Sequence, residues 1–456
     1  MTLTNRLNTH NNIAILWYGL EGRSTHNFLL KHGIDNEQIT ILDKNPACAV
    51  PASTRAILWD NYCDDIDQYD LVFKAPWITR ALIEPILSVP FKKIPWSSQT
   101  QLFFERYEGP TIWVTWTKGK TTTVTILHEI FKHAWYHAVL WWNAWHPILD
   151  LIDFEHPPEI VIYELSSFML DAIQQSNYTL DIGLFTSFFH THEKEHGSIA
   201  AYKQAKRTIA SHAKTLILWK QVVEAYGRQP DELPNNTVIF WKNTARDYDE
   251  QYIYQNQTQY IDHRAFRLPW VHNLYNLAAV CATVEQASTL GYTELKASLE
   301  HCVATFQWVE HRIEYVATKN WLHWYNDAIA TTPEATCAAI EAFQENVWCL
   351  LYGWIEWPYD HGLIISLIET YSINVLVLFP DTGHHIRAAV GDNPAFHILE
   401  TRSMDEAVAF ANKHTPNNSI VLLSCGSPSF SCRSWFKEKW TLFKQAVYAL
   451  PEEKSI

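Results

Sequence analysis

Glycine is the residue that this chain lacks most clearly. Average usage of roughly 7% glycine predicts about 32 glycines in a chain of this length, whereas its 456 residues include 14 glycines beside 21 tryptophans. Counting most of the tryptophans as glycines would restore an ordinary composition. The shortage of glycine and the excess of tryptophan therefore call for a common explanation.

Basic charge and long apolar runs are also scarce. The chain has 35 Lys and Arg residues against 49 Asp and Glu residues, and its net charge of −14 argues against a nucleic-acid-binding surface. No uncharged apolar run reaches the roughly 18 residues that a membrane span needs, and no signal segment opens the chain. The eight cysteines include no Cys-x-x-Cys pair, which argues against a zinc site or a disulfide framework. We expect a cytoplasmic monomer with no nucleic-acid or membrane partner.

What the chain does contain is a succession of α/β blocks. Its hydrophobic content of 47% is ample for the cores of two or three domains. The first block, residues 1–108, alternates strand-like runs at 13–16, 39–42 and 71–73 with a helix-like stretch at 24–31. This alternation predicts a small parallel sheet.

Two further blocks continue the alternation. Residues 105–110 have the composition of a linker into the second block, 109–302. The third block, 303–456, has strand-like runs at 348–352, 375–379 and 420–423. The predicted fold class is therefore α/β, with three domains.

A phosphate-binding loop is the strongest single signal in the second block. The apolar run Thr111 to Val114 predicts a buried strand, and the stretch from Thr121 to Phe131 predicts the helix that follows. Between them, Gly119-Lys120-Thr121-Thr122 places backbone N–H groups, a lysine and hydroxyls at a helix N-terminus, where a polyphosphate and Mg²⁺ would bind. Taken alone, the loop also fits a strand-turn-helix with an incidental lysine.

Seven motifs occur in a fixed order along the chain. They are Val114–Thr123, Tyr163–Phe168, His192–Lys206, Leu268–Asn276, His311-Arg312, Asn326–Thr336 and Leu423–Phe430. Together they resemble the motifs of the Mur ligase family, and most closely those of its D-glutamate-adding members. Each motif alone is weak, but seven in order are specific.

The resemblance implies a fold and a reaction. It implies a Rossmann-like N-terminal domain (1–108) for a UDP-linked substrate, a central P-loop ATPase-type α/β domain (109–302) for ATP, and a Rossmann-like C-terminal domain (303–456) for the amino acid. The implied enzyme is an ATP-dependent ligase of peptidoglycan and cell-wall synthesis. It would add D-glutamate to UDP-N-acetylmuramoyl-L-alanine through an acyl phosphate, with ATP and two Mg²⁺ ions.

The resemblance assigns phosphate and metal contacts in the second block. Lys120, with Gly119 and Thr122, would bind the phosphates, and the Thr121 hydroxyl would bind Mg²⁺. Glu164, after an apolar strand, offers the hard oxygen that Mg²⁺ prefers. A solvated carboxylate is the alternative for Glu164.

Four residues would complete the catalytic and adenine contacts. His192 would bind the second metal ion, and Lys206 would be carbamylated and so become an anionic metal ligand. Asn273 and Asn276, at i and i+3 on one helical face, would contact adenine. Taken without the resemblance, His192 is a surface histidine and Lys206 an exposed helix lysine.

The third block would add Arg312, also implied to be catalytic, and Asp327 to the nucleotide site, although a buried ion pair between them is the competing interpretation. The amino-acid acceptor would contact Thr331, Ser429 and Phe436.

The UDP-linked substrate would contact Gly19, Asp43 and Asn143. Gly19 lies in the turn Trp17–Ser24, which becomes a glycine-rich dinucleotide-type turn if Trp17 is read as glycine. An ordinary tight turn is the alternative.

Tryptophan replaces glycine throughout these family motifs. The replaced positions are Trp17, Trp77, Trp113, Trp116, Trp141, Trp142, Trp145, Trp270, Trp308, Trp321, Trp354 and Trp440. Gene decay would introduce many residue types instead of one. We therefore hypothesise that the gene reads UGA as glycine and has been translated with a code that reads UGA as tryptophan. Trp324 and Trp435 fit the family as aromatic residues, and Trp96, Trp219 and Trp357 stay undecided.

Other departures concern the His192 metal-ligand motif and the acceptor. The family's aspartate before His192 is Thr191, and a frequent family lysine is Ile329. Trp357 and Pro358 replace another basic residue and a glycine. Two alternatives therefore stay open: a Mur-type ligase for a different amino acid, and an inactive nucleotide-binding scaffold in which the tryptophans are real.

Overall fold

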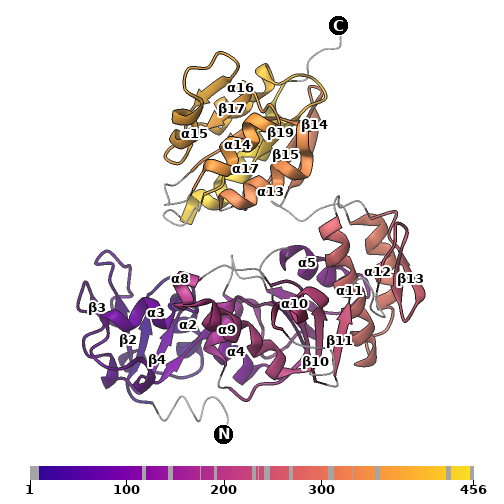
Figure 1. The fold of residues 1–456 in the computed structure, drawn as a ribbon. Coiled ribbons are helices and arrows are strands. Elements are labelled where there is room, and N and C mark those ends of the chain that lie inside the picture. Colours follow the sequence, from indigo (N-terminus) through magenta and orange to yellow (C-terminus); the bar gives the residue numbers. More distant parts are fainter. Residues whose placement is uncertain are drawn as a thin grey trace. The chain divides into compact units, whose positions relative to one another are not determined.

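A computed structural model gives the fold as two compact units, Met1–Phe306 and Gln307–Ile456. It describes residues 10–115, 120–141, 147–174, 176–188, 193–227, 233–234, 236–240, 247–266, 271–306, 313–330, 332–354, 360–427 and 433–451, without the side chains of 120, 193–194, 271–272 and 433–439. Figure 1 colours the second unit orange to yellow. Each unit is described by itself.

The first sheet has five parallel strands in the order β3-β2-β1-β4-β5. Its inner strands β1, β2 and β4 are short apolar runs and are buried, whereas the edge strand β3 is partly exposed. The strands are β1 (Ile13–Leu16), β2 (Ile39–Asp43), β3 (Arg55–Leu58), β4 (Leu71–Lys74) and β5 (Trp96–Ser97). The accompanying helices are α2 (Leu20–Lys31), α3 (Arg80–Ile83) and α4 (Gln99–Arg106), with 3₁₀ turns η1 (Asn36–Gln38), η2 (Ile66–Gln68), η3 (Glu84–Ile86) and η4 (Phe91–Lys93).

The second sheet has six parallel strands in the order β11-β10-β9-β6-β8-β7. Its central strands are buried along their length, as expected for a parallel sheet covered on both faces. The strands are β6 (Thr111–Thr115), β7 (Ala138–Trp141), β8 (Ile160–Glu164), β9 (Leu180–Phe185), β10 (Ala213–Trp219) and β11 (Thr237–Phe240). A hairpin of β12 (Tyr252–Gln255) and β13 (Thr258–Asp262) follows.

Helices connect these strands and close the first unit. They are α5 (Lys120–His133), α6 (Ile148–Leu151), α7 (Ser167–Ala172), α8 (Glu193–His196), α9 (Ile199–His212), α10 (Lys220–Ala225), α11 (Val271–Thr289) and α12 (Leu295–Thr305). One hydrophobic core continues from the first sheet through the second. Among the described residues, no helix has the length and apolar character needed to cross a bilayer.

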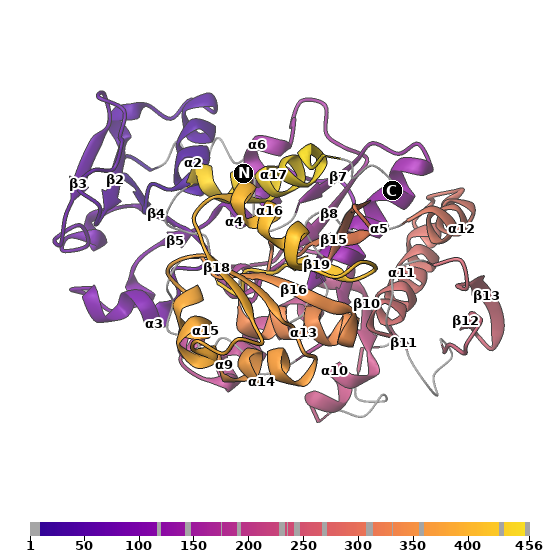
Figure 2. The same ribbon diagram turned by 90° about the horizontal axis from the view of Figure 1, so that it is seen from above.

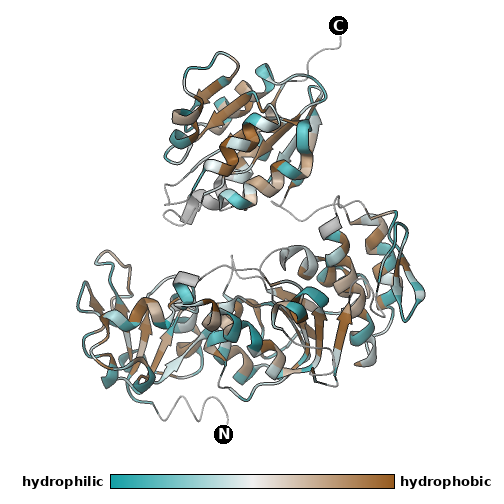
Figure 3. Cartoon of the chain, in the orientation of Figure 1, coloured by the Kyte–Doolittle hydropathy of each residue, from teal (hydrophilic) through white to brown (hydrophobic). Residues whose placement is uncertain are grey.

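The second unit is a six-stranded sheet in the order β14-β15-β19-β16-β17-β18, parallel except for the β14–β15 hairpin. Figure 2 shows α16 and α17 on one side of this sheet and α13 and α14 on the other, and Figure 3 shows that its strands are mostly apolar. The strands are β14 (Glu314–Lys319), β15 (Leu322–Asn326), β16 (Val347–Tyr352), β17 (Val375–Leu378), β18 (His397–Glu400) and β19 (Ile420–Leu423). The helices are α13 (Pro333–Phe343), η6 (Gln344–Asn346), α14 (Gly362–Thr370), α15 (Gly383–Val390), α16 (Met404–His414) and α17 (Arg433–Ala449).

The predicted α/β class is confirmed. Each strand-like run named from the sequence coincides with a strand, and the predicted helix at 24–31 is the later part of α2. The predicted boundary at 108/109 lies between α4 and β6, inside the first unit. The division at these residues into three domains stays a prediction.

Candidate active site

The predicted phosphate loop joins a buried strand to a helix. Strand β6 ends at Thr115, and α5 begins at Lys120. Thr121, Thr122 and Thr123 are buried in the first turn of α5. The backbone N–H groups of the first turn of a helix point along its axis and can bind anions.

Glu164 is buried beside the end of β6, the strand that leads into this loop. Strands β6 and β8 are neighbours, with Val114 level with Glu164, and the Leu165 amide donates to the Val114 carbonyl oxygen over 2.9 Å. Only 5% of Glu164 is exposed. The solvated-carboxylate alternative is therefore wrong, because Glu164 lies inside the carboxyl edge of the sheet.

Lys206 is also buried, with 2% of its surface exposed. Tyr202, Ala205 and Ile209 give α9 an apolar face, and Lys206 lies within the same packed layer. Its Nζ donates to Thr115 Oγ1 over 2.7 Å, and that hydroxyl donates to the Leu165 carbonyl oxygen over 2.8 Å. The exposed-lysine alternative is wrong, and Lys206 joins α9 to the ends of β6 and β8.

His196, which belongs to the motif His192–Lys206 but received no role from the sequence, lies close by. His196 Nε2 is 2.9 Å from Ser167 Oγ, and the imidazole stacks on Phe168 with ring centroids 4.9 Å apart. Ser167 and Phe168 open α7 directly after the Glu164 strand. His196 therefore links α8 to the segment that carries Glu164.

The two predicted adenine contacts share one face of α11. Asn273 and Asn276 are both buried, and Asn276 Nδ2 donates to Asn273 Oδ1 over 3.2 Å. The predicted i, i+3 arrangement is confirmed, and their role toward adenine stays a prediction.

In the first sheet, Gly19 is the N-cap residue of α2. The Tyr18 amide donates to Asp43 Oδ2 over 2.8 Å, and the Asn45 amide donates to Asp43 Oδ1 over 2.8 Å. Asp43 therefore ties the turn after β1 to the end of β2.

In the second unit, Asp327 is buried and accepts hydrogen bonds on both carboxylate oxygens. Ser424 Oγ donates to Oδ2 over 2.8 Å, and the Ile313 amide donates to Oδ1 over 3.3 Å. The alternative of an ion pair with Arg312 stays open, since Arg312 lies outside the described residues.

Several predicted site residues lie outside the part of the chain that the structure describes. They are Gly119, Asn143, His192, Arg312, Thr331 and Ser429, together with the side chains of Lys120 and Phe436. Within the described ranges, no three His, Cys, Asp or Glu side chains gather as a metal cluster. Of the predicted metal ligands, Thr121, Glu164 and Lys206 are described.

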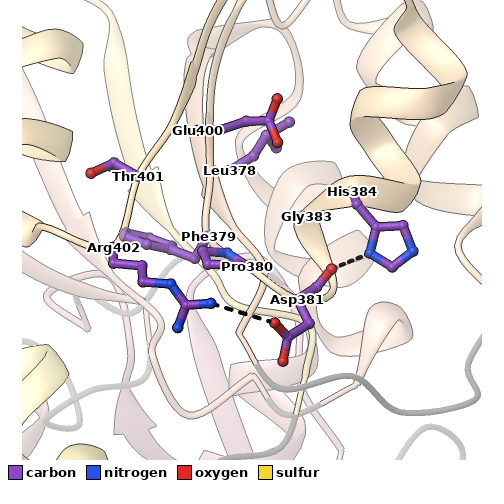
Figure 4. Close-up of a pocket in the computed structure, with 9 residues that line it drawn as sticks. All are labelled: Leu378, Phe379, Pro380, Asp381, Gly383, His384, Glu400, Thr401 and Arg402. Carbon is purple, nitrogen blue, oxygen red and sulfur yellow. Dashed lines mark hydrogen bonds and ion pairs between the residues drawn. The ribbon is translucent and has the colours of Figure 1, made fainter.

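A cavity of about 290 Å³ opens at the carboxyl ends of β17 and β18 in the second unit. Figure 4 shows Arg402 reaching toward Asp381, with a nitrogen-to-oxygen distance of 3.8 Å, and His384 beside the Asp381 backbone. Both members of the ion pair are largely exposed, which makes it weak. The cavity is thus an open, polar hollow on the edge where open α/β sheets bind ligands.

Comparison with known proteins agrees with this geometry. Residues 114–284 match the Mur ligase middle domain. The UDP-N-acetylmuramate-alanine ligase of Thermotoga maritima has a similar structure, with a TM-score of 0.57 and 17% identity, over 94% of this chain and 99% of that one. The chain has the Mur ligase fold. A Mur ligase of the same organism, MurF in complex with ADP, gives a TM-score of 0.55 at 14% identity, over 96% of this chain and 95% of that one.

Sequence similarity supports the Mur ligase family across the chain. The UDP-N-acetylmuramoylalanine–D-glutamate ligase of Acetivibrio thermocellus is 25% identical over 465 residues, which cover 96% of this chain and 96% of that protein. The similarity includes the three larger sheets, because it extends well beyond the matched middle domain.

Proposed function

We propose that this protein is an ATP-dependent ligase that joins D-glutamate to UDP-N-acetylmuramoyl-L-alanine in peptidoglycan synthesis. The observation that carries the proposal is the buried Lys206–Thr115 contact beside Glu164, at the strand end that leads into the phosphate loop. The similarity to Mur ligases over 96% of the chain supports the reaction class.

The residues of the site suit acyl-phosphate formation. The substrate carboxylate attacks the γ-phosphate of ATP, and the acyl phosphate and ADP are formed. The amine of the amino acid then attacks the acyl carbon, which releases phosphate and forms the amide. Lys120 and the N-terminus of α5 stabilise the charge that develops on the phosphates, while Asn273 and Asn276 offer polar groups for the adenine.

The donor set near the loop fits Mg²⁺. A hydroxyl (Thr121) and a carboxylate (Glu164), both buried, are hard oxygen ligands of the kind Mg²⁺ prefers. We propose two ions, with His192 and a carbamylated Lys206 as further ligands; when bound, they supply charge neutralisation at the phosphates. We also propose a cytoplasmic monomer whose three domains are 1–108, 109–302 and 303–456.

The proposed function requires small residues in the ligand loops, and we propose that the native protein carries glycine at most tryptophan positions. Among the tryptophans that the structure describes, four have positive φ angles: Trp17 (64°), Trp59 (83°), Trp135 (66°) and Trp321 (61°). A left-handed backbone costs a non-glycine residue roughly 1–2 kcal/mol. The sequence motifs singled out Trp17 and Trp321, whereas Trp59 and Trp135 are new.

Two of these positions belong to turns that favour glycine. Asn320 and Trp321 form the two-residue loop of the β14–β15 hairpin, both at positive φ, where the sequence Asn-Gly is preferred. Trp135 follows α5. Its amide donates to the Lys132 carbonyl oxygen, and the Tyr136 amide donates to the Phe131 carbonyl oxygen. This is a Schellman motif, whose left-handed residue is usually glycine.

The codons test this part of the proposal. We expect UGA at Trp17, Trp59, Trp135 and Trp321, and UGG at Trp324, which is fully buried in β15. UGG at all five positions would contradict it.

A phosphate-release assay tests the function. Glycine-restored protein is given ATP, UDP-N-acetylmuramoyl-L-alanine and one amino acid from a panel. Release with D-glutamate alone is the expected result. Release with another amino acid would indicate a different Mur-type ligase, and no release with any would favour the inactive scaffold.

A further inference from the structure

Lys74 lies at the point where the first sheet reverses its strand order. The chain builds β1, β2 and β3 toward one edge and then returns to place β4 and β5 on the other side of β1. Strands β1 and β4 are therefore neighbours, and Leu16 is level with Lys74 at their carboxyl ends. Open parallel sheets bind ligands outside such a switch point.

The turn after β1 has the spacing of a phosphate cradle. Trp17, Gly19 and Gly22 occupy the three glycine positions of a Gly-x-Gly-x-x-Gly pattern. Trp17 has a φ of 64°, and a Cβ on Gly22 would lie 2.7 Å from the Trp17 carbonyl oxygen. The backbone at Trp17, the first glycine position, is left-handed. Gly22, the third, packs too closely on the turn to admit a side chain, as in dinucleotide-binding turns.

Two indoles occupy the loops at this edge. The rings of Trp17 and Trp77 lie 4.3 Å apart, and Trp17 Nε1 donates to Tyr62 Oη over 3.3 Å. Trp77 belongs to the loop that follows Lys74. Glycine at both positions would remove the side chains that meet over the switch point.

The ammonium of Lys74 is buried with few partners. Only 9% of the residue is exposed, and Nζ donates to the Ile78 carbonyl oxygen over 2.9 Å. Among the described residues this is its one hydrogen bond, so two of its three N–H donors have no protein acceptor there. A buried charge without full pairing is costly and requires water or a ligand.

Two nearby carboxyl groups do not satisfy this charge. Glu21 on α2 and Asp171 on α7 are close enough to interact electrostatically with Lys74, yet neither lies within 4.0 Å of it. Burial raises the pKa of Glu21 to about 7 and also raises the pKa of Asp171, which disfavours both anions. Glu21 Oε2 is buried without a hydrogen-bond partner in the described part of the chain.

We propose that Lys74 contacts the diphosphate of the UDP-linked substrate at this switch point. The inference rests on the proposed function and adds a binding residue to it. A diphosphate carries the charge that a buried ammonium lacks, and the N-terminus of α2, a helix of 12 residues, adds backbone N–H groups beside it.

The test uses the full chain with Trp17→Gly and Trp77→Gly as the parent. UDP affinity is measured by calorimetry, and binding of uridine, which lacks phosphate, is measured by NMR titration. Lys74→Met, which keeps the volume but removes the charge, should weaken UDP binding at least about tenfold and leave uridine binding unchanged. Lys74→Gln gives a second uncharged variant in case Lys74→Met folds poorly. Lys31→Met removes an exposed cation from the far end of α2 and should change neither affinity.

Three results would overturn the proposal: no UDP binding by the parent, UDP affinity unchanged in both Lys74 variants, or equal loss of UDP and uridine binding. The last would indicate a structural role for Lys74. Failure of the ligase function is a separate result, in which UDP binding depends on Lys74 but no amino acid supports phosphate release.

Discussion

Lys206 Nζ and Thr115 Oγ1 lie 2.7 Å apart inside the central sheet's carboxyl edge. Thr115 is the last residue of β6 before the phosphate loop, and Lys206 comes from the middle of α9. This contact places a buried, modifiable amine beside Glu164, which is a metal-ligand position in the proposed mechanism.

Lys206→Ala should nearly eliminate ligase activity in the glycine-restored protein, because the proposed carbamate ligates Mg²⁺. Added acetate or formate should restore part of the rate, since a small carboxylate can occupy the vacated space. Lys206→Met fills that space and should be equally inactive without rescue. Phosphate release measures all three effects, and near wild-type activity of Lys206→Met would show that the site does not need Lys206.

Lys120→Ala should abolish turnover and leave the fold intact, because the lysine stabilises transition-state charge. Carboxylates should not rescue this variant, since it has lost a cation. Lys132→Ala, at the exposed end of the same helix, is the matched control and should keep its activity. Activity of Lys120→Ala within tenfold of the parent would mean that catalysis uses another phosphate site.

The sequence predicted the sheets well because their strands are short apolar runs between turn residues. It could not decide between a buried and an exposed Lys206, since a single lysine on a helix carries no signal of what packs over it. His196 belongs to a motif named from the sequence but received no role there, and Lys74 was missed, because their partners, Ser167 and Ile78, come together with them only in the fold. The motif resemblance supplied the roles of Glu164 and Lys206, and the structure supplied their burial.

Tryptophans in left-handed backbone should destabilise the chain as written. Trp135 is 94% exposed and Trp321 is 63% exposed, so their replacement loses little packing. Trp135→Gly and Trp321→Gly should each raise the free energy of unfolding by about 1 kcal/mol, measured by urea denaturation. Trp324→Gly, in the core, should lower it by about 3–5 kcal/mol or more. Equal destabilisation by all three would contradict the glycine assignment.

Glu21 should make stability depend on pH. Burial raises its pKa from 4.5 to about 7 in the folded protein, so the folded state binds the proton more tightly than the unfolded state. The free energy of unfolding should therefore fall as pH rises from 4.5 to 7, by up to about 3 kcal/mol. Glu21→Gln should remove most of this decline and leave the smaller part that the raised pKa of Asp171 contributes, whereas Glu37→Gln, at an exposed position, should keep all of it. If the free energy of unfolding of Glu21→Gln fell with pH as steeply as that of the parent, the pH dependence would come from other groups.

Purification from the organism that encodes the gene gives the most direct test, because the protein then carries whichever residues that organism inserts. The product is analysed by mass spectrometry after incubation with ATP, UDP-N-acetylmuramoyl-L-alanine and D-glutamate. We predict ADP, phosphate and UDP-N-acetylmuramoyl-L-alanyl-D-glutamate, formed only when all three substrates are present. ATP binding without any amide product from this protein would contradict the assignment as a D-glutamate ligase.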